Sequence, residues 1–301
     1  MGIAKTGLGF RATVLGLLLM ASVAFAWASP SLARAVREPS ELEDALWERV
    51  NDFRRDPRGE ILALGVDMEE WREVYIPSNL PPLAWNEAVR EALCLHVEAM
   101  VGGSLQGEGL QDRLRRQDGA VPPMEAAVGL FFFRNIQSEE KLLDAFMKQI
   151  VEEEVRFMGE RPLRLLNESY RDVGVCAFPA QLDALVGEPA NGYVFVLLLA
   201  TMGDRPAFVG RVYADRNANG KWDPGEGVGD VTLVALGPGP LEEEREMYEA
   251  RTSTPEGIYS LQGDKGLYAF QLWKDGGLIW PGSNAVLEDR NVREDFVVLE
   301  P

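Results

Sequence analysis

Residues 193–201 read YVFVLLLAT, and this apolar run decides the fold of the first part of the chain. Side chains alternate between the two faces of a strand, so a strand with this sequence presents apolar side chains on both faces. Such a strand must be buried on both sides, which is typical of a sheet that lies between helices. We therefore expect helices on each side of this strand.

The residues before the run predict those helices and one more strand. Ser40-Glu41-Leu42-Glu43 is a capping box that begins a first helix, and Asn86 can cap a second helix. A third amphipathic helix begins near Ser138, and residues 172–178 have the pattern of a second strand. Residues 40–203 are therefore predicted to form one domain, a three-layer α–β–α sandwich.

The pattern changes at residues 203–206, where glycine and proline interrupt both the helical and the strand periodicity. Short strand-like runs follow, separated by Gly, Pro, Asp and Asn, over 208–214, 231–236, 247–252, 258–261, 267–273 and 296–299. Such runs without a helical period predict an all-β sandwich of the immunoglobulin or prealbumin type over 207–301. The whole chain is thus expected to be an α+β protein with two domains.

Composition restricts the classes of function. The 301 residues contain 30 Lys and Arg against 48 Asp and Glu, which gives a formal net charge of −18. So acidic a surface repels phosphate backbones and anionic lipid headgroups, which argues against nucleic-acid binding and is compatible with cation binding. The single histidine, His96, excludes any site that needs two imidazoles from one chain, such as H-E-x-x-H.

The N-terminus has the pattern of a secretory signal peptide. Lys5 and Arg11 precede an uncharged run over 12–27, and small-residue cleavage patterns such as Ala24-Phe25-Ala26 follow. The alternative is an uncleaved membrane anchor, but the run is shorter than the roughly 20 residues that span a bilayer. Residues 1–35 are therefore predicted to be removed, which leaves a secreted or cell-envelope protein without a stable membrane span.

The two cysteines, Cys94 and Cys176, are too few for a disulfide-stapled scaffold. Export permits one disulfide between them, and two buried apolar thiols are equally consistent with the sequence. Their pairing is therefore left open at this point.

Three stretches of the first domain carry a family resemblance. They are Val50-Asn51-Asp52-Phe53-Arg54, Leu83-Ala84-Trp85-Asn86 and residues 165–175, which read LLNESYRDVGV. In this order and spacing they resemble the CAP superfamily of cysteine-rich secretory, antigen 5 and pathogenesis-related proteins, over roughly residues 41–202. The resemblance implies an α–β–α sandwich and, in metal-binding members, a cleft with two histidines and two glutamates.

This sequence lacks the cleft ligands that the resemblance implies. Gln106 and Arg161 stand where the family's histidines are expected, and Val128-Gly129-Leu130 stands where its glutamate and asparagine are expected. His96 matches a helical position that is not a cleft ligand. Two residues apart on a helix, Cys94 and His96 face opposite sides and cannot form a dyad. No catalytic residue is predicted.

A second resemblance covers roughly residues 209–298. Gly210-Arg211-Val212-Tyr213-Ala214-Asp215 opens the segment, and Gly257-Ile258-Tyr259-Ser260-Leu261 and Gly266-Leu267-Tyr268 follow. These residues resemble the B-type repeat domains of bacterial surface adhesins (the SdrD B-like and Cna B-like group). Some relatives carry a Lys–Asn isopeptide bond whose lysine lies in the opening strand. Because that strand contains Arg211 and no lysine, no such bond is expected.

Residues 215–226 read DRNANGKWDPGE and fit the calcium-loop pattern D-x-[DN]-x-[DN]-G-x5-E. The expected oxygen donors are the side chains of Asp215, Asn217, Asn219, Asp223 and Glu226 and the carbonyl of Lys221, with Gly220 in the sharp turn. Oxygen ligands without sulfur or imidazole favour Ca²⁺ over zinc or copper. The flanking residues are strand-like, so a strand-connecting loop is expected and not an EF-hand. The alternative is an Asx- and Gly-rich turn that binds no metal.

Together these features predict an exported, non-enzymatic binding or adhesion protein with a calcium-stabilised β-sandwich. The expected ligand is an extracellular protein, a glycan or a lipid. Two alternatives belong to other classes. A secreted CAP-type hydrolase would rely on His96 or on carboxylates alone. A lipid or sterol carrier would line a groove with Phe131-Phe132-Phe133, a run for which core packing is the simpler explanation.

Overall fold

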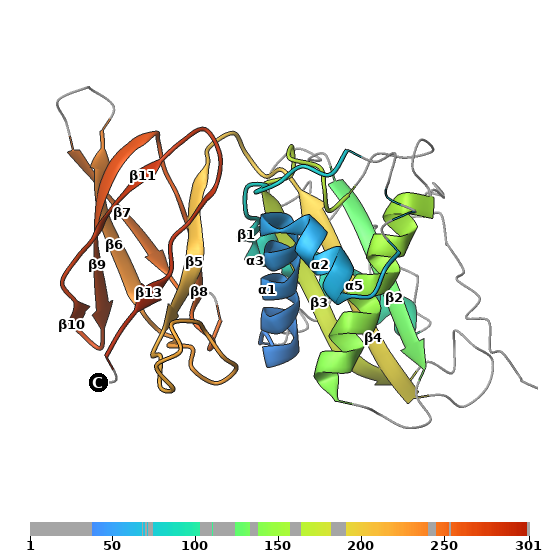
Figure 1. Cartoon of the computed structure of the whole chain (residues 1–301). Coiled ribbons are helices and arrows are strands. Elements are labelled where there is room, and N and C mark those ends of the chain that lie inside the picture. Colours follow the sequence, from blue (N-terminus) through green and yellow to red (C-terminus); the bar gives the residue numbers. More distant parts are fainter. Residues whose placement is uncertain are drawn as a thin grey trace, which may run out of the picture. The chain divides into compact units, whose positions relative to one another are not determined.

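The apolar run lies in strand β4 (Asn191–Ala200), within a four-stranded sheet that organises the first part of the chain (Figure 1). The computed structural model describes residues 38–67, 69, 71, 75–102, 110, 124–132, 138–156, 164–181, 191–239, 245–252 and 254–299. The predicted signal peptide over 1–35 lies outside the described residues, as do Gln106, Phe133 and Arg161.

The sheet order is β1 (Ala84–Trp85), β3 (Asp172–Gln181), β4 and β2 (Met124–Phe132). β1 runs parallel to β3, whereas β3 and β2 both run antiparallel to β4. β2 pairs with β4 along its whole length, from Met124 opposite Ala200 to Phe132 opposite Gly192. The segment 128–130, where the family pattern expects a cleft glutamate, is therefore part of a sheet strand.

Helices cover both faces of this sheet. The short helix α2 (Pro57–Ala63) comes directly after the first helix in the chain. Phe195 and Leu197 of β4 alternate in sequence with Val194 and Val196. The first pair belongs to the core that contains α1 (Glu41–Arg55) and α5 (Glu139–Arg156), and the second pair packs with α3 (Glu87–Val101). Apolar residues on both faces of β4 are thus explained, because each face contacts a different set of helices.

The predicted helix starts are confirmed. Ser40 accepts a hydrogen bond from the Glu43 N–H, and the Glu43 carboxylate accepts one from the Ser40 N–H, which completes the capping box of α1. Asn86 caps α3 by accepting from the Val89 N–H at 3.1 Å. Gly174 lets α3 approach β3 closely, because a Cβ there would lie 2.7 Å from the Arg90 backbone nitrogen.

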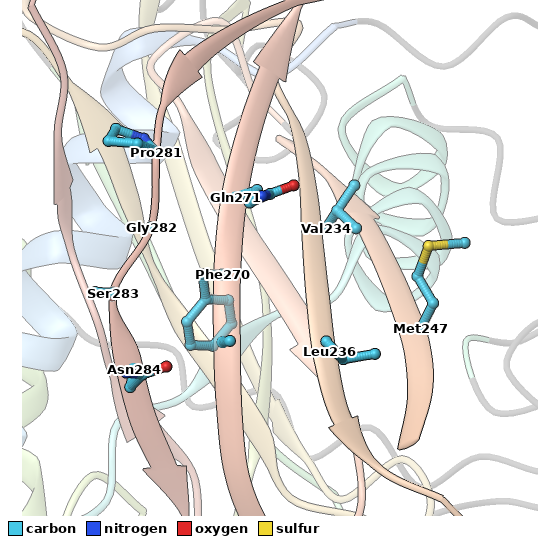
Figure 2. Close-up of a pocket in the computed structure, with 10 residues that line it drawn as sticks. Val234, Leu236, Met247, Phe270, Gln271, Pro281, Gly282, Ser283 and Asn284 are labelled. Atoms are coloured by element: carbon cyan, nitrogen blue, oxygen red, sulfur yellow. The ribbon is translucent and has the colours of Figure 1, made fainter. Parts of the chain in front are cut away.

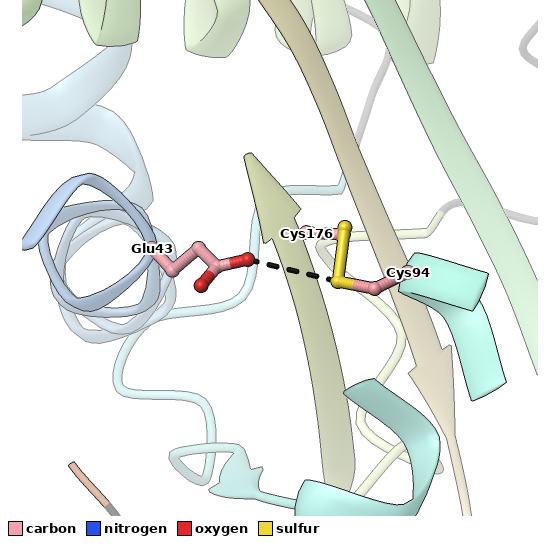
Figure 3. A group of neighbouring side chains, drawn as sticks. All are labelled: Glu43, Cys94 and Cys176. Atoms are coloured by element: carbon pink, nitrogen blue, oxygen red, sulfur yellow. Dashed lines mark hydrogen bonds between the residues drawn. A yellow bond between two sulfur atoms is a disulfide. The ribbon is translucent and has the colours of Figure 1, made fainter. Parts of the chain in front are cut away.

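Cys94 of α3 and Cys176 of β3 form a disulfide, with 5.3 Å between their Cα atoms (Figure 3). The buried Glu43 carboxylate lies beside the bridge, 3.7 Å from the Cys94 sulfur, and it also accepts the Ala177 N–H at 3.0 Å. β1 is too short to pair with β3 beyond Val173, so Glu43 satisfies a backbone donor on the open edge of β3. One carboxylate therefore joins α1 to the strand that the disulfide fixes.

The C-terminal part of the chain is an all-β region of antiparallel sheets, to which two short strands add in parallel. One sheet has the order β10 (Gly277–Trp280), β9 (Gly266–Lys274), β6 (Thr232–Pro238) and β7 (Arg245–Arg251), and β11 (Asn284–Leu287) also pairs with β9. In the other sheet β5 (Ala207–Tyr213) pairs with β8 (Ile258–Gln262) on one side and with β12 (Val292–Arg293) and β13 (Phe296–Val297) on the other.

Aromatic residues fill the space between these two sheets. Phe208 of β5 packs edge-on against Tyr268 and Phe270 of β9, with ring centroids 5.2 and 4.9 Å apart. Aromatic pairs in this arrangement contribute about 0.5–1.5 kcal/mol beyond the area that they bury. The inward residues alternate along β9 with Leu267, Ala269 and Gln271, so one face of this sheet remains open to solvent.

The described residues belong to one compact unit in which the β region contacts the helix-covered sheet. Ser260 of β8 donates to the Trp85 carbonyl of β1 at 3.1 Å. Asn291 is buried, and its side-chain amide donates to the carbonyls of Pro82 and Arg171 at 3.0 and 2.7 Å. These hydrogen bonds connect the two regions through side chains of the β region and backbone carbonyls of the first region.

Candidate metal site in the loop after strand β5

The predicted calcium loop begins directly after β5 and is closed at its base by backbone pairing. Tyr213, the last residue of β5, forms an isolated antiparallel bridge with Gly227. The Ala214 N–H donates to the Glu226 carbonyl, and the Val228 N–H donates to the Val212 carbonyl, both at 2.9 Å. The loop is therefore an excursion between two extended segments, with no helix on either side.

Asp215, the first predicted ligand, is oriented by the backbone of the loop. Its two carboxylate oxygens accept from the Asn219 N–H at 3.0 Å and from the Gly220 N–H at 2.8 Å. The sharp turn that makes this possible needs positive φ angles, which are +56° at Ala218 and +74° at Gly220. Glycine adopts such angles without strain, which explains its place at the sixth position.

The side chains of Asn217, Asn219 and Asp223 meet inside the loop. Both amide nitrogens donate to the same Asp223 oxygen, at 2.7 and 2.6 Å. The Asn217 and Asn219 amide oxygens accept from the N–H groups of Asn219 and Lys221. An amide group presents either its nitrogen or its oxygen after a rotation of its terminal torsion, so these side chains can turn an oxygen toward a cation next to Asp223.

Glu226, the last predicted ligand, is only 5% exposed and closes the loop. One of its carboxylate oxygens accepts from the Arg216 N–H and the other from the Asp223 N–H, both at 3.0 Å. Glu226 thus contacts both ends of the loop. The carboxylates of Asp215, Asp223 and Glu226 do not lie within 4.8 Å of one another, so cation binding would need the loop to tighten.

The donor set fits a hard cation. Asp215, Asn217, Asn219 and Asp223 converge through their hydrogen bonds, and all four supply oxygen atoms. Among them and Glu226 are three carboxylates, and carboxylate oxygens suit hard cations such as Ca²⁺. The Lys221 side chain is exposed. That the carbonyl oxygen of Lys221 binds the cation remains a prediction.

Among the described residues, the one group of three His, Cys, Asp or Glu side chains whose ligand atoms lie within 4.8 Å of one another is Glu43 with Cys94 and Cys176 (Figure 3). Both sulfurs are consumed in the disulfide, and only thiolates are metal ligands. Burial of Glu43 beside Arg90, at 3.2 Å, gives the carboxylate a structural partner instead. We assign this group to the core of the fold.

His96, the single histidine, lies on α3 and is 9% exposed. Its helix packs against the sheet face that holds Cys176, and Cys94 on the same helix is bonded to that cysteine. A buried imidazole on a packed helix lacks the access that a catalytic base needs. Cys94 cannot serve as its nucleophile because its sulfur is not free.

A shallow pocket of about 500 Å³ lies on the open face of the sheet that contains β6, β7 and β9 (Figure 2). Its lining is largely apolar, and Leu236 and Met247 are 49% and 68% exposed. Gln271 and Asn284 add amide groups to the lining. No charged side chain is among the residues that line this pocket.

Sequence reasoning missed a buried charged cluster next to the loop. Arg211 of β5 is fully buried and faces Glu48 of α1, with 3.7 Å between Nη2 and Oε2. Burial raises the pKa of Glu48, and Arg293 and Arg211 oppose this rise. Burial likewise lowers the pKa of Arg211, against the effect of Glu48 and Asp44. The signal in the sequence was an arginine at an otherwise apolar strand position, but its acidic partners Glu48 and Asp44 on α1 are more than 150 residues away.

Comparison with protein-family models finds no matching family, and comparison with curated proteins finds no match. Among the described residues, none of the helices combines the length and the hydrophobicity that a membrane span needs.

Proposed function

We propose that the chain is an exported, non-enzymatic binding or adhesion protein whose β region is stabilised by calcium. The observation that carries the proposal is the loop over 215–226, in which four oxygen-bearing side chains are held together on a strand-connecting turn. A loop of this kind contributes folding energy when it binds a cation, because the bound form exists only in the folded state.

Two independent features support export. The N-terminal 35 residues combine cations, an apolar run and small-residue cleavage patterns. The Cys94–Cys176 disulfide is weakly suggestive of an oxidising compartment, since such bonds form and persist mainly outside the cytosol.

We also propose a fold type for each of the two regions. Helices on both faces of the first sheet support a CAP-like α–β–α sandwich, and two packed sheets with an aromatic core support a sandwich of the immunoglobulin or prealbumin type. With the family's histidines replaced by Gln106 and Arg161, such a CAP-like module would bind rather than catalyse. A protein, glycan or lipid outside the cell is its proposed partner.

A hydrolase reading has less support, because His96 is buried and Cys94 is disulfide-bonded. Lipid carriage has no specific observation in its favour, because Phe131 and Phe132 lie in the sheet strand β2. Binding is therefore the function that the described residues support best.

The experiment is thermal unfolding of the mature chain in excess Ca²⁺ and in chelator. At a calcium concentration about 100 times the dissociation constant, we expect roughly 2.7 kcal/mol of added stability. Asp215→Asn removes a charged ligand, so most of the calcium-dependent increase in Tm should be lost. Glu226→Gln should do the same, because it removes the second carboxylate oxygen that closes the loop.

Asp230→Asn is the matched control, because Asp230 is an exposed acid near the loop that occupies no ligand position. Its φ of +57° is also one that asparagine tolerates. The control should keep the wild-type shift. A wild-type chain that melts at the same temperature in both solutions would contradict the calcium proposal, and the loop would then be an Asx-rich turn.

A further inference from the structure

Trp222 connects the loop to the buried charged cluster. It is the eighth residue of the loop, next to Asp223, and its ring lies over the Arg211 guanidinium with 3.7 Å between Cζ and the ring centroid. An indole face attracts a cation through the ring quadrupole, and more strongly where water is excluded. Arg211 is fully buried, and the loop supplies the aromatic ring that contacts its guanidinium group.

Glu256 makes a second connection between the same elements. Its carboxylate accepts from the N–H groups of Gly225 and Gly227 at the end of the loop, both at 3.3 Å. Its backbone carbonyl accepts from Arg211 Nη1 at 2.7 Å. The position of Arg211 thus depends on the loop through both a ring contact and a hydrogen-bonded backbone.

On its other side Arg211 faces helix α1. Its Nη2 lies 3.7 Å from Glu48 Oε2, and its Cζ lies 5.7 Å from the ring centroid of Trp47. Arg293 of β12 holds the second Glu48 oxygen at 2.8 Å. Buried ion pairs depend strongly on geometry, because a small displacement leaves a desolvated charge without its partner.

We propose that calcium binding to the loop strengthens the packing of α1 against the β region through Trp222 and Arg211. The proposal rests on the calcium proposal above. It involves two states, one with Trp222 stacked on Arg211, as in this structure, and one with the ring released. A cation that fixes Asp223 also fixes the backbone of Trp222, so it favours the first state.

The test is hydrogen exchange of the mature chain in Ca²⁺, with Mg²⁺ and chelator as comparisons. In the wild type, calcium should slow exchange both in the loop and in the α1 segment 41–55. Couplings between sites are typically about 5-fold or more, and a slowing of at least this size is expected in α1. Trp222→Leu leaves every predicted ligand in place, so the loop should still respond to calcium while the response of α1 is lost.

Trp273→Leu is the matched control, because Trp273 is a half-buried tryptophan of β9 outside the loop. It should keep the α1 response. If Trp222→Leu does not fold, a second variant tests the same coupling. Glu48→Gln lies on α1 and occupies no ligand position. Because the coupling is reciprocal, weakening the contact of α1 with Arg211 should lower the calcium affinity, by at most the factor by which calcium protects α1.

Protection of the wild-type loop without protection of α1 would overturn the coupling and leave the calcium proposal intact. Unchanged calcium affinity in folded Glu48→Gln would also overturn it. Absence of any calcium response in the loop would overturn both proposals together, and the unfolding experiment above would show the same result.

Discussion

Asp44 shows how burial changes the chemistry of one residue. It lies on α1 beside Glu43 and is almost completely buried. Burial raises the pKa of Asp44 to about 7, because a carboxylate loses its hydration there. Arg211 and the Thr254 side chain oppose the rise, and the negative charges of Glu256 and Glu43 add to it.

The raised pKa predicts that stability falls as pH rises. The unfolded chain loses the Asp44 proton near pH 4, whereas the folded chain keeps it until about pH 7, so the free energy of unfolding decreases between these values. Asp44→Asn removes this dependence and should be more stable than the wild type at pH 8, by up to about 4 kcal/mol. Denaturant unfolding at pH 4, 6 and 8 measures the difference.

The difference between the variant and the wild type should shrink toward pH 4. Asp230→Asn, at an exposed position, should follow the wild-type pH dependence. Parallel curves for wild type and Asp44→Asn would show that Asp44 is ionised in the folded chain throughout this range.

At the scale of elements, α3 and β3 are held together by the disulfide and by close packing at Gly174. The cysteines are 82 residues apart in the sequence, so the bond closes a long loop of the unfolded chain. Restricting a loop of that length stabilises the folded state by about 4–5 kcal/mol in the chain-entropy model.

Reduction should therefore lower the stability of the chain strongly. The sequence contains only these two cysteines, so a thiol reductant acts on this bond alone. We expect Tm of the mature chain to drop in reductant, because the unfolded state gains conformational freedom. The double variant Cys94→Ala/Cys176→Ala should melt at the lower temperature with or without reductant. Equal Tm for oxidised and reduced wild type would mean that the bond is absent in the purified protein.

At the scale of the whole molecule, one compact unit contains a helix-covered sheet and an all-β region, and both contribute to a shared contact around Arg211, Glu48 and Asn291. The disulfide within this unit is weakly suggestive of an oxidising compartment.

Export predicts a shortened N-terminus. Because a signal peptidase cleaves after small-residue patterns, the secreted chain should begin between Trp27 and Val36. Intact mass of protein recovered from the medium or the periplasm gives the cleavage site directly. Recovery of only the full-length chain, and only from membranes, would support the anchor alternative instead.

Much of the secondary structure was predictable because its signals are local. The capping box at Ser40, the cap at Asn86 and the apolar run in β4 each predicted an element that the structure contains. Strand β2 was missed, since MEAAVGLFF lacks a clear alternation and its pairing with β4 lies some 60 residues away. The short strands β1, β10, β11 and β12 were also missed, because strands of two to four residues show no periodicity and only their pairing defines them.

The sequence by itself determined where α1, α3 and α5 begin, that β4 is apolar on both faces, and the spacing of the oxygen donors in the loop, because all of these are properties of consecutive residues. Only the tertiary structure decided that Cys94 and Cys176 pair, that Glu43 completes the edge of β3, and that Arg211 lies between Trp222 and Glu48. These contacts join residues that are distant in the chain, and their energies depend on distances and burial that only the packed molecule establishes.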